Sequence, residues 1–270
     1  MAIKIEPGFI DGLPNAEYHG AKEWLGSTSL KTLALKTPAH YKHDQCNPKE
    51  SDAFLIGTAF HSLTLEDDRE SIELIDFASW TGKAAKEAKN AAIANGKNPL
   101  LAKDMPVIEA MRDAVFAHPL AKKLFTGHVA EQSFFWEDDG LKLKARPDAQ
   151  NLGLIGDLKS CLSANPSDFA RSAYSLGYFI SAAHYQDGVY ALTGERPSFV
   201  FVNVEKTAPY LVSVIELDQD AIDWGSRMLD RAKRIYRECT ESGTWPGYAN
   251  YSKISLPRWA EYELEELESE

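Results

Sequence analysis

The stretch LIGDLK, residues 154–159, carries the most informative pattern in the sequence. Its first three residues are typical of a buried strand, and two charged residues, Asp157 and Lys159, follow at once. Side chains two positions apart in a strand share a face, so Asp157 and Lys159 are expected to lie side by side. Buried charges are costly unless they are paired or bound to a metal, so this strand is a candidate functional element.

Strand patterns flank this stretch on both sides. The turn Asp138-Asp139-Gly140 is a hairpin signal, and the segments before and after it alternate between apolar and polar residues. The predicted strands are Val129–Glu137, Leu141–Asp148, Leu152–Leu158, Ser198–Glu205 and Leu211–Leu217.

Helical patterns fill most of the rest of the chain. The predicted helices are Ser27–Lys36, Ala53–Leu65, 106–125, Ser167–Thr193 and Asp218–Glu241, and the segment 82–103 is expected to be a polar helix or a mobile arm. This order predicts an α/β (α+β) fold, with a mixed central sheet flanked by helices and a helical decoration at the N-terminus. We expect one domain over 1–270: a mainly helical part (1–128), a sheet-and-helix part that carries the site (129–260) and an acidic tail (261–270).

The formal net charge of the 270-residue chain is −11, which by itself argues against a nucleic-acid partner. Six glutamates lie in the last ten residues, however, so the remainder is only mildly acidic. The three cysteines, Cys46, Cys161 and Cys239, are too few for a four-cysteine iron–sulfur cluster and are expected to be free thiols. Without a long apolar run or a signal-peptide pattern, the protein is expected in the cytoplasm, away from membranes.

Two carboxylates and an ammonium are expected to meet near one end of the sheet. Asp148 ends a predicted strand, and the turn Asn151–Gly153 can bring it alongside Asp157 and Lys159. Oxygen ligands suit Mg²⁺, for which Mn²⁺ could substitute, and the carbonyl of Leu158 is a further candidate ligand. Lys159 could then orient a water or stabilise developing charge. The alternative is structural, because D-x-K pairs on strands and Pro-Asp turns are common.

Two further features are weak by themselves. His61 lies within an apolar helix, where a hydrogen-bonded core histidine is the ordinary interpretation. Gln186 and Tyr190 are four residues apart and share a helix face.

Together these residues resemble a known family. The motifs GTAFH (57–61), RPD (146–148), GDLK (156–159) and QDGVY (186–190) occur in the order seen in the PD-(D/E)xK nucleases. Within them, the chain is similar to the RecE-type exonucleases, the nuclease domain of exodeoxyribonuclease VIII, in a phage or prophage version. Ser29, Thr37-Pro38 and 256–260 extend the resemblance to nearly the whole chain.

The resemblance implies a restriction-endonuclease-like core and Mg²⁺-dependent hydrolysis of DNA. It implies 5′→3′ action on duplex ends that leaves a 3′ single strand for recombination. It also implies a single-strand annealing recombination protein as a partner and assembly of the chain into a homo-oligomeric ring. The implied metal ligands are His61, Asp148 and Asp157, with Glu131 near a metal and Lys159 as the catalytic lysine. Gln186 and Tyr190 are implied as a helix pair that supports the site or contacts DNA. The D-x-K here has aspartate where glutamate is commoner.

Two DNA contacts are also expected. Lys83, Lys86 and Lys89 recur every third residue and could face DNA, or they could form an ordinary solvated helix face. Ser27, Thr28 and Ser29 begin a predicted helix and, with Lys31, could bind a terminal phosphate. The alternative is that Ser27 or Thr28 is an ordinary helix N-cap.

Other functions stay open at this point. The same fold supports an endonuclease or a nuclease of the other polarity. It also supports a non-catalytic module that binds DNA ends or protein.

Overall fold

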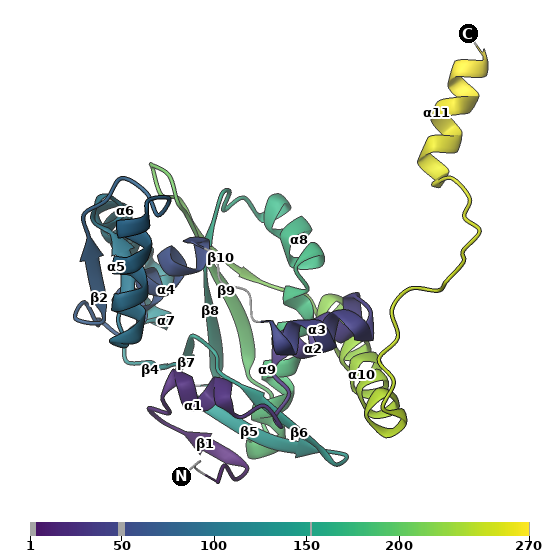
Figure 1. Cartoon of the computed structure of the whole chain (residues 1–270), viewed down its shortest axis with the longest axis horizontal. Coiled ribbons are helices and arrows are strands. Elements are labelled where there is room, and N and C mark those ends of the chain that lie inside the picture. The colour runs from purple at the N-terminus through teal and green to yellow at the C-terminus, as the bar shows by residue number, and fades with distance from the viewer. Residues whose placement is uncertain (1–3, 48–51, 152, 270) are drawn as a thin grey trace.

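Five strands form the central sheet, in the order β10-β9-β8-β7-β4 (Figure 1). The computed structural model describes residues 4–47, 52–151 and 153–269. Strands β8 and β9 pair in parallel and the other neighbours pair antiparallel, so the sheet is mixed, as predicted. The strands are β4 (Val129–Ala130), β7 (Ala149–Asn151), β8 (Leu154–Cys161), β9 (Ser198–Glu205) and β10 (Val212–Glu216).

Two smaller sheets accompany it. The predicted hairpin is present, and β1 adds to its edge in the order β1-β5-β6. A parallel pair, β2-β3, lies in the N-terminal half. These strands are β1 (Gly8–Ile10), β2 (Ile72–Ile75), β3 (Asn98–Leu101), β5 (Ser133–Asp138) and β6 (Leu141–Ala145).

Helices cover both faces of the central sheet. Alternate residues of β8 and β9 point to opposite faces, so each strand contributes to two cores that contain different helices. Ile155 and Phe201 join the core that includes α9 and α10, whereas Leu158 and Val202 join the core of α4, α6 and α7. The helices are α1 (Asn15–Gly20), α2 (Ser27–Leu35), α3 (Pro38–Cys46), α4 (Asp52–Leu65), α5 (Lys83–Ala94), α6 (Met105–Ala117), α7 (Pro119–Leu124), α8 (Pro166–Ser175), α9 (Tyr178–Thr193), α10 (Gln219–Ser242) and α11 (Arg258–Ser269), with a 3₁₀ turn at Ala102–Asp104.

Four predicted elements are wrong in extent. Ser167–Thr193 is two helices, because Gly177 adopts a left-handed φ of 66° between α8 and α9. The segment 106–125 also breaks in two, at Pro119, which cannot continue a preceding helix. The segment 82–103 ends in strand β3, and Val129–Glu137 divides into β4 and β5 on either side of Glu131, whose φ is 49°.

The last helix, α11, projects away from the rest of the protein on an extended segment (Figure 1). The three cysteines are free thiols, as expected. Within the described residues, no helix has the length and apolar character needed to cross a membrane.

Candidate functional site

The register of one hairpin brings the two predicted aspartates together. Ala149 of β7 pairs with Gly156 of β8, so Asp148 and Asp157 occupy the next facing positions. Asp148 Oδ2 accepts a hydrogen bond of 2.6 Å from the backbone N–H of Leu158. Asp148 and Asp157 therefore meet as the sequence predicts, next to the first residue of β7.

His61 and Glu131 approach Asp148 from two other elements. One ligand atom of each of these three residues lies within 4.8 Å of the other two. His61, on α4, has its Nδ1 3.6 Å from Asp148 Oδ1 and its Nε2 2.9 Å from the carbonyl oxygen of Leu158. Glu131 sits in the break between β4 and β5, where its N–H donates to the carbonyl of Asp148 over 3.3 Å.

The electrostatics of this cluster fit a divalent cation. Burial and the neighbouring Asp148 carboxylate raise the pKa of Glu131 to about 8. A cation would offset both effects, because it favours the charged form of its ligands. Two carboxylates, one imidazole and an adjacent backbone carbonyl are donors that Mg²⁺ or Mn²⁺ accepts.

Asp157 lies beside this cluster and is ion-paired with Lys159. Only 6% of Asp157 is exposed, and burial is the main cause of its raised pKa, with Asp148 adding to it. Burial alone would lower the pKa of Lys159, but the carboxylates of Asp157 and Asp148 outweigh burial and raise it. Lys159 is therefore protonated. The metal-ligand roles expected for Asp157 and Leu158 stay predictions.

An aromatic ring that sequence reasoning missed lies under the lysines. Lys159 Nζ is 5.3 Å from the ring centre of Tyr178, and Lys31 Nζ is 5.7 Å from the same ring. Burial and the nearby Lys159 lower the pKa of Lys31 to about 8. Lys31 thus lies over the same ring as Lys159 and is not among the residues that line the pocket in which it was expected.

Helix α9 places Tyr178 and Tyr185 near the site, and the roles expected for Gln186 and Tyr190 stay predictions. Tyr178 and Tyr185 are seven residues apart and share a side of the helix, and Asp157 and Asp148 add to the burial that raises the pKa of Tyr185. Gln186 instead donates to the carbonyl of Pro197 at 2.8 Å, before the start of β9. Tyr190 is about half exposed, with the guanidinium of Arg196 over its ring. The signal that could have identified this face is the spacing of the tyrosines.

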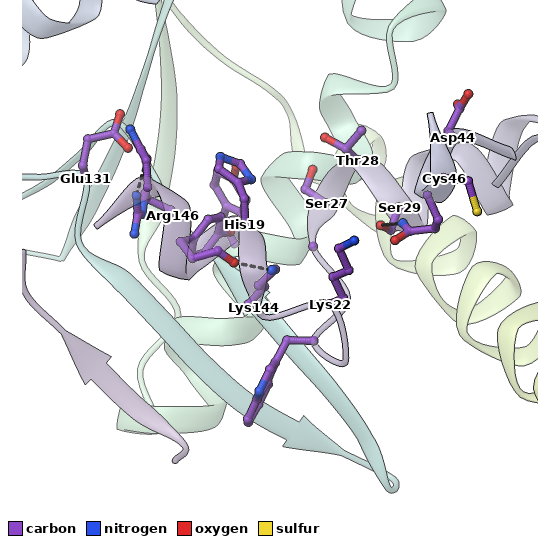
Figure 2. A pocket seen from close by; sticks show the side chains of 16 residues that line it. His19, Lys22, Ser27, Thr28, Ser29, Asp44, Cys46, Glu131, Lys144 and Arg146 are labelled. Carbon is purple, nitrogen blue, oxygen red and sulfur yellow. Dashed lines mark hydrogen bonds between the residues drawn. The ribbon is translucent and has the colours of Figure 1, made fainter. Parts of the chain in front are cut away.

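A pocket of about 700 Å³ adjoins the cluster and is lined by cationic and hydroxyl side chains (Figure 2). Glu131 and Arg146 lie toward one end and Ser29 toward the other, with Lys144 between them. The cationic lining residues are Lys22, Lys144 and Arg146, the hydroxyls include Ser27, Thr28 and Ser29, and the carboxylates are Glu131 and Asp44.

The start of α2 differs from its expected form. Gly26 is the N-cap, and Ser27 is already helical, so the expected Ser27 or Thr28 cap is wrong. Ser27 Oγ is instead hydrogen-bonded to Ser181 Oγ at 2.8 Å, and Gln45 donates to Ser29 Oγ.

The lysines of α5 do not line this pocket. Lys83 forms an ion pair with Glu87, and Lys89 lies over the ring of Trp80. Lys86 lines a separate cavity of about 370 Å³. Their expected contact with DNA stays a prediction.

Comparison with known proteins gives two findings. Residues 27–254 match the model of a family described as a PDDEXK-like domain of unknown function (DUF3799). A crystal structure from Eubacterium rectale, of a protein provisionally named an exonuclease, is similar with a TM-score of 0.64. Its sequence is 18% identical, over 92% of this chain and 96% of that chain, so the likeness shows a shared fold. A search of curated proteins found no match.

Proposed function

The chain belongs to the family of PDDEXK-like domains of unknown function, and on this premise we propose that it is a metal-dependent nuclease that hydrolyses DNA. One observation carries the proposal: the ligand atoms of His61, Glu131 and Asp148 converge within 4.8 Å, next to the ion pair that buried Asp157 forms with Lys159. Nothing in an ordinary core favours so many charges, since burying them is costly.

Each residue of the cluster has a distinct task in this proposal. His61, Glu131 and Asp148 would hold the cation with the carbonyl of Leu158, and a bound Mg²⁺ would polarise the phosphodiester and lower the pKa of a water. Lys159 donates a charge-assisted hydrogen bond to the oxygen on which charge develops. Asp157 keeps the ammonium of Lys159 in place.

The finer part of the proposal is exonuclease action on duplex ends, in the 5′→3′ direction, which leaves a 3′ overhang for recombination. The pocket beside Glu131 supports action at an end, because its lysines, arginine and hydroxyls suit a terminal phosphate. The provisional name of the Eubacterium rectale protein agrees with an exonuclease. The direction rests on the resemblance to RecE-type enzymes, as does an annealing protein that would receive the product strand.

Digestion of a linear duplex with separately labelled 5′ and 3′ ends tests the proposal. With Mg²⁺, we expect early release of the 5′ label as short products, and no release when a chelator is present. A covalently closed circle should resist digestion. Cleavage of the circle would identify an endonuclease, early release of the 3′ label would reverse the direction, and inactivity with Mg²⁺ and with Mn²⁺ would leave a non-catalytic module.

A matched pair of variants ties the activity to the cluster. Asp148→Asn should abolish cleavage and weaken Mg²⁺ binding in calorimetry. Asp113→Asn, the same change at an exposed position on α6, should leave both unchanged. Full activity in Asp148→Asn would refute the assignment of the site.

A further inference from the structure

Two segments of the chain pair on both sides of a gap. Strand β4 pairs with β7 and β5 pairs with β6 in the same antiparallel register, and the ladder is interrupted between these two pairings. With that register carried across the gap, Glu131 faces Asp148 and Ser133 faces Arg146. The gap therefore contains two of the three residues whose ligand atoms converge in the cluster.

The side chain of Arg146 bridges this gap. Its Nε donates a hydrogen bond of 2.8 Å to the Oγ of Ser133, which is fully buried and lies two residues from Glu131. Pro147, in the middle of the gap, has no N–H for a ladder bond. The guanidinium therefore joins the two segments at a point where the backbone does not.

The N-terminal segment, residues 13–21, holds the other side of this guanidinium. Nη1 of Arg146 donates to Asn15 Oδ1 over 2.5 Å, and Nη2 donates to the carbonyl of Leu13 over 2.7 Å. The guanidinium carbon lies 4.2 Å from the centre of the Tyr18 ring. A planar group with donors on three nitrogens can join three segments in one fixed geometry, which an ammonium cannot do.

The charge of Arg146 stays available to the site. In the parts of the chain that the structure describes, the three acceptors of its hydrogen bonds are neutral, and no carboxylate forms an ion pair with it. Figure 2 shows Arg146 beside Glu131 at one end of the pocket. Burial raises the pKa of Glu131, and the guanidinium opposes that rise. Three of its five N–H groups are used, so two remain for a phosphate in the pocket.

We propose that Arg146 is a positioning residue of the metal cluster, which locks the gap so that Glu131 and Asp148 face the same cation. The inference rests on the proposed function, because it concerns the cation that the cluster would hold. Glu131 adopts a φ of 49°, which residues other than glycine rarely adopt, so neighbouring contacts must hold it there. Arg146 acts through the two ligand residues and does not itself bind the cation.

Hydrogen exchange of the metal-free chain measures the gap directly. Arg146→Lys keeps the charge and loses the planar fork, so backbone N–H groups in 129–133 and in the N-terminal segment should exchange faster than in the wild type. Lys144→Met is the matched control, because Lys144 Nζ donates to two carbonyls of the same N-terminal segment and to no residue of the gap. It should speed exchange in the N-terminal segment alone.

Calorimetric titration with Mg²⁺ in the absence of DNA tests the consequence for the ligands. Arg146→Lys should weaken Mg²⁺ binding by about 10–100-fold, the usual effect of losing a group that orients metal ligands. Lys144→Met and Arg171→Lys, the latter exposed on α8, should bind Mg²⁺ like the wild type. In cleavage assays, excess Mg²⁺ should restore Arg146→Lys, because a merely structural defect would not change the Mg²⁺ requirement.

A second pair of variants reaches the same guanidinium through its support. Asn15→Ala removes the acceptor of Nη1, whereas Asn15→Asp keeps an acceptor oxygen there. Asn15→Ala should weaken Mg²⁺ binding by about 2–10-fold, the range for one hydrogen bond, and Asn15→Asp should bind like the wild type. Asn15 is exposed, so this pair decides the question if Arg146→Lys does not fold.

Three outcomes would overturn the inference. Wild-type Mg²⁺ affinity in Arg146→Lys, or in Asn15→Ala where it decides, would leave Arg146 as a tether of the N-terminal segment only. An equal loss of Mg²⁺ affinity in Lys144→Met would assign the effect to that segment and not to the gap. A wild-type chain that binds neither Mg²⁺ nor Mn²⁺ would refute the proposed function as well, so the two failures are distinguishable.

Discussion

Replacing Lys159 by methionine removes the cation from the buried pair while it keeps much of the side-chain length. Asp157, 6% exposed, would then be a buried carboxylate without its cation, beside Asp148. Breaking a buried pair by removing one partner costs about 3–5 kcal/mol. The side chain of Lys159 is 27% exposed, so water screens part of the interaction. We therefore expect a loss of about 3 kcal/mol in the free energy of unfolding without metal.

The loss should depend on pH in a defined direction. Burial already raises the pKa of Asp157, and loss of Lys159 raises it further. A carboxyl with a raised folded-state pKa destabilises the fold as pH rises, because it ionises more readily in the unfolded chain. The difference between Lys159→Met and the wild type should thus be large at about pH 8 and smaller at about pH 5.

Urea unfolding in the presence of a chelator measures this difference. Lys36→Met, at the exposed end of α2, is the matched control and should change stability by less than about 0.5 kcal/mol. In cleavage assays, Lys159→Met should lower kcat by about 10²–10³-fold, the usual effect of losing one preorganised donor. Wild-type stability of Lys159→Met at about pH 8 would refute the buried-pair argument.

Three more predictions follow from other parts of the structure. Burial lowers the pKa of His184 to about 4, so the stability gained from keeping this imidazole neutral, about 3 kcal/mol, should be lost as pH falls from about 6.5 to 4. In urea titrations, the free energy of unfolding of His184→Gln should therefore change less with pH than that of the wild type. A Cβ on Gly225 would clash with the backbone carbonyl of Phe179, so Gly225→Ala should lower stability by about 1–3 kcal/mol. The control Gly57→Ala has open space and should gain up to about 1 kcal/mol; equal thermal midpoints for the two would contradict this. If the pocket at the start of α2 binds a terminal phosphate, the double variant Ser27→Ala/Ser29→Ala should lose any preference for 5′-phosphorylated over 5′-hydroxyl duplex ends. An unchanged ratio of the cleavage rates on the two ends would mean that these hydroxyls are only structural.

Much of the sheet could be predicted because its signals are local. Alternation locates the strands, and the Asp138-Asp139-Gly140 turn fixes the β5–β6 hairpin, in which Asp138 pairs with Leu141. The breaks were missed because they depend on single residues. Glu131 adopts a positive φ that its residue type disfavours, and it does so where it joins the cluster around Asp148.

The residues of the site also fall into a group that local signals predict and a group that they do not. Asp148, Asp157 and Lys159 lie within one hairpin, so their spacing along the chain is enough to predict that they meet. The other residues of the site come from distant segments. The family resemblance, and not the spacing of residues, indicates His61 and Glu131. No sequence signal links Tyr178 or Lys31 to Lys159. Helix α9 illustrates the limit, because the sequence allows several faces and only packing against β9, where Tyr178 stacks on Phe201, and against α2 selects the one with Tyr178.

By itself, the sequence determined the strand that carries the D-x-K pair, the hairpin that aligns it with Asp148, and the acidic, aromatic C-terminal end. Only the tertiary structure decided that His61 reaches the carbonyl of Leu158, 97 residues away, and that α5 and α11 lie at opposite ends of the molecule. The physical reason is the range of the interactions. Alternation and turn residues act over a few positions, whereas contacts between distant segments depend on how every helix packs on the two faces of the sheet.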